Sequence, residues 1–141
     1  MVTGFAEAMR QREPGESVLA RARRFYTESL TRGDPTLGHR GVGFARMVDA
    51  SPALLARERQ IHDQREVVLA AALAQDLNAV ADDITPRIVT AQVTGALRVL
   101  YYEARRRLLA GQSGTELDDA LAQTAQSAFD LLQTDLGDYG S

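Results

Sequence analysis

The stretch that most constrains the fold runs from Pro86 to Leu109, with the sequence PRIVTAQVTGALRVLYYEARRRLL. Read as a helix, it carries two apolar stripes. The first stripe contains Ile88, Ala91, Gly95, Val99 and Tyr102, and the second contains Val89, Val93, Ala96, Leu97 and Leu100. A helix on the surface of a monomer needs one apolar stripe. This helix is therefore predicted to have neighbours on two sides, and we assign one stripe to the subunit core and the other, as a hypothesis, to a partner subunit.

Two details of this stretch add to the prediction. A glycine inside a helix costs about 1 kcal/mol of stability relative to alanine. One use that would explain Gly95 is the close approach of another backbone at this position. The run from Arg105 to Arg107 lies in the last turn, where cations suit the helix C-terminus and are expected to be solvated. Gly111 is expected to end the helix.

The remaining segments also have helical patterns. Ser17 and Ser51 are suitable N-caps, Gly33 is a suitable stop, and the spacing from Ser113 to Glu116 is that of a capping box. The expected helices are 2–11, 17–31, 51–77 and 116–134, with a less regular one in 34–50. No segment alternates as a strand would, so the prediction is an all-α bundle of five or six helices.

The helix over 51–77 is expected to be amphipathic. Its predicted core side is Leu54, Ile61, Val68 and Leu73, and its predicted solvent side is mostly Arg57, Glu58, Arg59, Arg65 and Glu66. In the final helix the predicted apolar stripe is Leu117, Leu121, Thr124, Ala128, Leu131 and Leu132. The expected organisation is the end of a connecting helix in 1–15, a domain in 16–136 and a disordered tail in 137–141.

Composition excludes several classes of function. The chain of 141 residues has a net charge of −3, which gives no general attraction to nucleic acid, and it has no cysteine for disulfides or thiolate sites. No run reaches the ~18 apolar residues of a membrane span, and the N-terminus does not read as a signal peptide. A cytoplasmic protein without a membrane partner is therefore expected.

Catalytic and metal motifs are weak. The two histidines, His39 and His62, are not part of a helical metal motif, no serine lies in a nucleophile elbow, and no cofactor is predicted. The adjacent pairs Asp82-Asp83 and Asp118-Asp119 suit helix starts better than acid–base catalysis. A small metal-dependent helical enzyme using His39 and His62 stays open as an alternative, although the prediction is that the chain is not an enzyme.

A ligand site between helices is the remaining chemistry. Its candidate residues are soft apolar or polar-tipped side chains, as in helical ligand cavities: Tyr26, Phe44, Met47, His62, Arg65 and Tyr102. His62 or Arg65 is expected to orient a polar group of the ligand. Each residue taken alone is also compatible with core packing, so a purely structural dimerisation module is a further alternative.

Three strings together resemble the C-terminal half of TetR-family transcriptional regulators: FARMVDASPALLARERQIHDQREVVLAAALAQDL, TPRIVTAQVTGALRVLYYEARRRLLAG and ELDDALAQTAQSAFDLL. The resemblance covers about Val18 to Leu132. It consists of a shared helical order and style, which are an S-P-A-L start, a long helix, an acidic turn and a helix rich in Ala, Leu and Arg that ends in Gly.

The resemblance implies a domain that binds a small hydrophobic or aromatic effector and forms a homodimer through the last two long helices, here Pro86–Leu109 and Glu116–Thr134. The expected interface residues are Val93, Leu97, Leu121, Thr124, Ala128 and Leu132. In such a regulator, effector binding changes the spacing of two helix-turn-helix domains on the operator. That DNA-binding domain has no counterpart in these residues, so specific DNA binding by this chain is expected to be absent.

Overall fold

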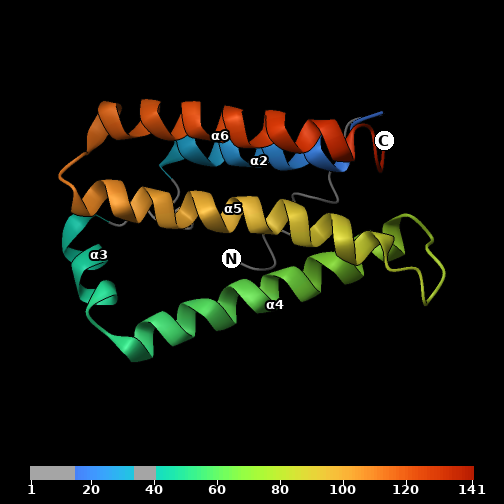
Figure 1. Cartoon of the computed structure of the whole chain (residues 1–141), viewed down its shortest axis with the longest axis horizontal. Helices are drawn as coiled ribbons and strands as arrows, with labels where there is room; N and C mark the ends of the chain where they lie inside the picture. Colours follow the sequence, from blue (N-terminus) through green and yellow to red (C-terminus); the bar gives the residue numbers. More distant parts are fainter. Residues whose placement is uncertain (1–14, 34–40) are drawn as a thin grey trace.

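A computed structural model describes residues 15–33 and 41–141 (Figure 1). This part of the chain forms five α-helices and no strand, which confirms the all-helical prediction: α2 (Val18–Arg32), α3 (Val42–Asp49), α4 (Pro52–Asp76), α5 (Thr85–Leu109) and α6 (Gly114–Leu136). None of these helices has both the length and the apolar content needed to cross a membrane. The predicted helix over 2–11 and the candidate residue His39 lie outside the described residues.

Helix α5 is the central element of the bundle. It packs against α6 on one side and against α4 on the other, while α2 lies along α6 (Figure 1). The short helix α3 contacts both α4 and α5. It lies at the end of the bundle where α4 begins and α5 ends. The arrangement leaves α4 attached mainly through α5.

The helix ends mostly follow the predicted signals. The Ser17 hydroxyl accepts a hydrogen bond from the Ala20 amide at 3.1 Å, and Ser51 caps α4 in the same way. Gly33 ends α2 in the left-handed conformation. The capping box predicted at the start of α6 is wrong, because Ser113 makes no side-chain cap and the positive φ of Gly114 changes the backbone path there.

The second apolar stripe of α5 forms the core of the single chain. Val89, Val93, Leu97 and Leu100 are buried and pack with apolar residues of α2, α4 and α6. Most of the first stripe faces outward instead, with Ile88 50% and Val99 67% exposed, whereas its last member, Tyr102, contacts His62 of α4. No other described segment would contact a Cβ placed at Gly95, so the close approach predicted there does not occur within the chain. One stripe therefore does hold the subunit together, as predicted.

This finding corrects half of the predicted dimer interface. Val93, Leu97 and Leu121 lie in the subunit's own core, so their side chains are unavailable to a second copy. Of the other predicted interface residues, Thr124, Ala128 and Leu132 are partly buried, and Leu132 packs against the same core. The prediction failed because it gave the dimer the stripe that α5 needs for its own fold.

The predicted faces of α4 are also wrong in part. Its buried residues are His62, Leu69, Ala72 and Leu73, whereas Leu54 and Val68 are exposed. Glu58 and Arg65, which were predicted to face solvent, are partly buried. In the first half of α4, Glu58 and His62 contact α5, whereas the second half packs into the core through Leu69 and Leu73.

The tail over 137–141, which was predicted to be disordered, packs on α2. The Val18 amide donates a hydrogen bond to the Tyr139 carbonyl at 2.9 Å, and the Tyr139 side chain packs against the core. Gly140 is required by its surroundings, because its φ is +77° and a Cβ there would lie 2.5 Å from Val18 Cγ2. These contacts fix the tail to the start of α2.

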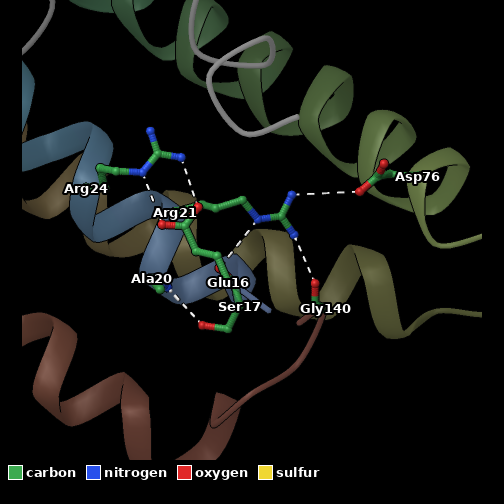
Figure 2. Close-up of polar contacts among 7 residues, drawn as sticks. All are labelled: Glu16, Ser17, Ala20, Arg21, Arg24, Asp76 and Gly140. Atoms are coloured by element: carbon green, nitrogen blue, oxygen red, sulfur yellow. Dashed lines mark hydrogen bonds and ion pairs between the residues drawn. The ribbon is translucent and has the colours of Figure 1, made fainter. Parts of the chain in front are cut away.

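Arg21 lies beneath this tail and is only 2% exposed (Figure 2). Its Nε donates to the Ser17 carbonyl and its Nη2 donates to the Gly140 carbonyl, each at 3.4 Å. Its Nη1 lies 3.7 Å from the Asp76 carboxylate at the end of α4. Arg21 thus joins α2, the last turn of α4 and the tail, while the neighbouring Arg24 binds Glu16 near the surface.

Candidate functional site

Ionisable and aromatic side chains gather where the first half of α4 meets the second half of α5. Glu58 and His62 come from α4, one turn apart, and Tyr101, Tyr102 and Arg105 come from α5. We refer to these five residues as the α4–α5 cluster. Side chains three or four positions apart lie on the same face of a helix, which is why each helix presents its members together.

An ion pair between Glu58 and Arg105 connects the two helices. Arg105 Nη1 donates to Glu58 Oε1 at 2.9 Å and Nη2 donates to Oε2, so the contact is bidentate. The Tyr101 hydroxyl donates to the same Oε2 at 2.6 Å. The side chains of Arg105 and Glu58 are 8% and 13% exposed. Burial opposes ionisation of Glu58, but the hydrogen bonds from Arg105 and Tyr101 outweigh it and hold its pKa below the usual value.

Three rings pack edge to face beside this ion pair. The His62 ring centroid lies 5.0 Å from that of Tyr101 and 5.6 Å from that of Tyr102, and the two tyrosine rings are 5.4 Å apart. The Arg105 guanidinium carbon lies 5.4 Å and 5.6 Å from the two tyrosine centroids. A cation within about 6 Å of an aromatic face is attracted to it. The cluster therefore combines the charged guanidinium of Arg105 with aromatic surface.

The titration of the cluster does not suit proton transfer at neutral pH. Burial, together with the charges of Arg65 and Arg98, lowers the pKa of His62 to about 4. Burial, together with the hydrogen bond to Glu58, raises the pKa of Tyr101 to about 12. A general acid or base works best with a pKa near the operating pH. The arrangement is better suited to binding than to acid–base catalysis.

The structure brings only some of the predicted ligand residues together. His62 and Tyr102 are in contact, and Arg65 lies close enough on α4 to act on the His62 charge. Phe44 and Met47 lie exposed on α3, which contacts both α4 and α5. Tyr26 lies elsewhere, in the core between α2 and α6, with its ring 6.4 Å from that of Phe129.

Sequence reasoning missed Glu58, Tyr101 and Arg105. It placed Glu58 on the solvent side of α4 and Arg105 in a solvated last turn. The signal that was available is a matching spacing of i, i+4 and i+7 on the two helices. It is found in Glu58, His62 and Arg65 on α4 and in Arg98, Tyr102 and Arg105 on α5.

The alternative metal site is not supported by an additional ligand near His62. Within residues 15–33 and 41–141, no group of three or more His, Cys, Asp or Glu side chains is placed to hold a metal ion. Asp83, which was predicted to suit a helix start, accepts a hydrogen bond from the Thr85 amide at 3.0 Å at the start of α5.

Replacing Tyr26 with phenylalanine is expected to raise the free energy of unfolding by about 1 kcal/mol, because the variant removes a buried polar atom without a partner. The Tyr26 hydroxyl is buried and makes no hydrogen bond with the residues that the structure describes. Burial and the nearby Asp118 raise its pKa to about 12. Urea unfolding of both proteins at pH 7 measures the change. A loss of stability in the variant would show that the hydroxyl is satisfied in solution.

Stability is expected to fall between pH 7 and pH 4.5 in a way that depends on His62. Its pKa is about 4 in the folded chain against 6.5 for an ordinary histidine. In this pH window His62 becomes protonated in the unfolded chain but stays mostly neutral in the folded chain. Acid therefore favours unfolding. Between pH 7 and pH 4.5, the free energy of unfolding of the His62→Gln variant should fall by about 2 kcal/mol less than that of the wild-type chain. The figure follows because one pKa unit corresponds to about 1.4 kcal/mol. Equal pH dependence of urea unfolding in the two proteins would contradict this assignment.

Comparison of the chain with protein-family models, with characterised proteins and with solved structures finds no significant match.

Proposed function

We propose that the chain is the ligand-binding and dimerisation domain of a TetR-like transcriptional regulator, sensing a small hydrophobic or aromatic effector. The observation that carries the proposal is the α4–α5 cluster, which places aromatic rings and a few fixed polar groups between two long helices of a bundle. Ligand sites in helical bundles lie between helices and have this mixture of apolar and polar lining.

The order of the helices supports the proposal. A long helix beginning at Ser51-Pro52, a polar connection, a long central helix with a stop at Gly111 and a final helix follow one another as the resemblance implies. The shifted pKa values of His62 and Tyr101 favour binding over catalysis. In this proposal the DNA is contacted by a helix-turn-helix domain outside these 141 residues, and the regulator acts in the cytoplasm.

The dimer in this proposal uses the outward stripe of α5. Ile88, Ala91 and Val99 are exposed apolar residues on that stripe, and Leu131 on α6 is also exposed. Replacing Ile88 and Val99 together with aspartate should give a monomer in sedimentation velocity, because charges oppose burial in an apolar interface. A wild-type chain that sediments as a monomer at micromolar concentration would contradict the homodimer.

A thermal-shift screen of aromatic and hydrophobic metabolites tests ligand binding. A ligand that binds only the folded chain stabilises it by about 2.7 kcal/mol at one hundred times its Kd, so a binder should raise Tm clearly. The Tyr102→Ala variant should lose the response, whereas Gln126→Ala, at an exposed position of α6, should retain it. The proposal fails if no compound raises Tm, or if Tyr102→Ala responds like the wild-type chain.

A further inference from the structure

We infer that the effector carries a carboxylate, and that Arg105 binds this carboxylate in exchange for Glu58. The inference rests on the proposed function and specifies the chemical class of its ligand as an aromatic carboxylic acid. It follows from the geometry of the α4–α5 cluster, in which one guanidinium group faces both a carboxylate and two aromatic rings.

The position of Arg105 matches both parts of such a ligand. Its planar fork already holds a carboxylate in the bidentate geometry that guanidinium groups favour. Tyr101 and Tyr102 lie beside the same guanidinium and are partly exposed, so a ligand ring has aromatic surface to contact without unfolding of the helices. The Tyr101 hydroxyl, which now donates to Glu58, provides a second donor for the arriving carboxylate.

The charges around the cluster favour an anion over a cation. The ionised side chains that act most strongly on His62 and Tyr102 are four arginines and two carboxylates: Arg59, Arg65, Arg98, Arg105, Glu58 and Asp63. The chain as a whole carries a net charge of −3, so this local excess of positive charge differs in sign from the rest of the molecule. A ligand that brings one negative charge reduces the excess.

The exchange also explains how binding would change the structure. Glu58 lies near the start of α4 and Arg105 near the end of α5, so their ion pair fastens these two helix ends together. When a ligand carboxylate occupies the fork of Arg105, Glu58 loses its hydrogen-bond donors and this connection is released. The site thereby couples ligand binding to the position of α4, which packs on the bundle mainly through α5.

Calorimetric titration of the whole chain with three matched probes tests the inference. Benzoate, benzamide and benzylammonium have the same ring and differ in the charge of the substituent. Benzoate is expected to bind, and Glu58→Gln is expected to bind it about tenfold more tightly, which corresponds to about 1.4 kcal/mol, because the competing anion becomes neutral. Arg105→Gln should abolish benzoate binding while its circular dichroism spectrum stays helical.

The outcomes separate the inference from the proposed function. If Arg105→Gln does not fold, Glu58→Gln decides, because it retains Arg105 and Tyr101, and unchanged or weaker benzoate binding overturns the inference. Equal binding of benzamide, or tighter binding of benzylammonium, overturns the carboxylate assignment and leaves a ligand-binding domain standing. Failure of all three probes also overturns it, and the wider screen with Tyr102→Ala then decides the proposed function independently.

Discussion

Replacing Arg21 with alanine is expected to lower the free energy of unfolding by about 3 kcal/mol, because it breaks a buried charged contact and leaves unfilled space. Arg21 is 2% exposed, and its guanidinium contacts Ser17, Gly140 and Asp76. Its loss leaves the Gly140 carbonyl without this donor and weakens the attachment of α4 at its last turn. Urea unfolding monitored by circular dichroism measures the change.

Two variants serve as controls for Arg21. Arg24→Ala removes a neighbouring arginine of the same helix whose ion pair with Glu16 is more exposed, so it should cost less than about 1 kcal/mol. Arg21→Met retains much of the side-chain volume and removes the hydrogen bonds. Its loss in free energy of unfolding should therefore lie between those of the two alanine variants. Equal losses for Arg21→Ala and Arg24→Ala would show that the buried position of Arg21 contributes nothing.

The second large effect is expected at the ion pair of Glu58 and Arg105. Each single alanine variant should cost about 3 kcal/mol, because it leaves the partner charge partly buried without its counterion. The double variant should cost less than the sum, with a coupling energy of about 2 kcal/mol, since the second substitution removes a charge that is already unpaired. A double-mutant cycle in urea measures this coupling.

A matched pair on the same two helices provides the control for this cycle. Arg98 on α5 donates to Asp63 on α4 at 3.1 Å, but the Asp63 side chain is largely exposed. Exposed ion pairs couple by less than about 1 kcal/mol because water screens them. If the Arg98–Asp63 cycle gives the same coupling as the Glu58–Arg105 cycle, burial of the latter pair has no energetic effect.

The positions of the helices were predictable because short-range chemistry decides them. Ser17, Ser51 and Gly33 act through hydrogen bonds or backbone conformations within a few residues, and the sequence contains all of that information. The apolar period of α5 was also sufficient to predict a stripe for the subunit core. The apolar period does not predict which stripe of α5 faces the core. Both stripes have similar side chains, and the choice between them depends on how α4 and α6 are placed.

The α4–α5 cluster was less predictable for a related physical reason. A charged residue such as Glu58 or Arg105 is usually solvated, so a single sequence favours assigning it to the surface. Burial becomes acceptable only when the partner on the other helix lies at hydrogen-bond distance, and that register depends on the packing of α4 against α5. Tyr26 illustrates the converse case, since its polar tip suggested a ligand site but its ring packs within the core.

The contact between Arg21 and Gly140 has a consequence for the order of folding. The two residues are separated by 119 positions in the sequence, and the same region contains the bond from the Val18 amide to the Tyr139 carbonyl. Contacts between residues so distant in sequence form late, because a long loop must close first. During synthesis on the ribosome, the beginning of α2 therefore waits for residues 137–141 to emerge before its arginine is covered.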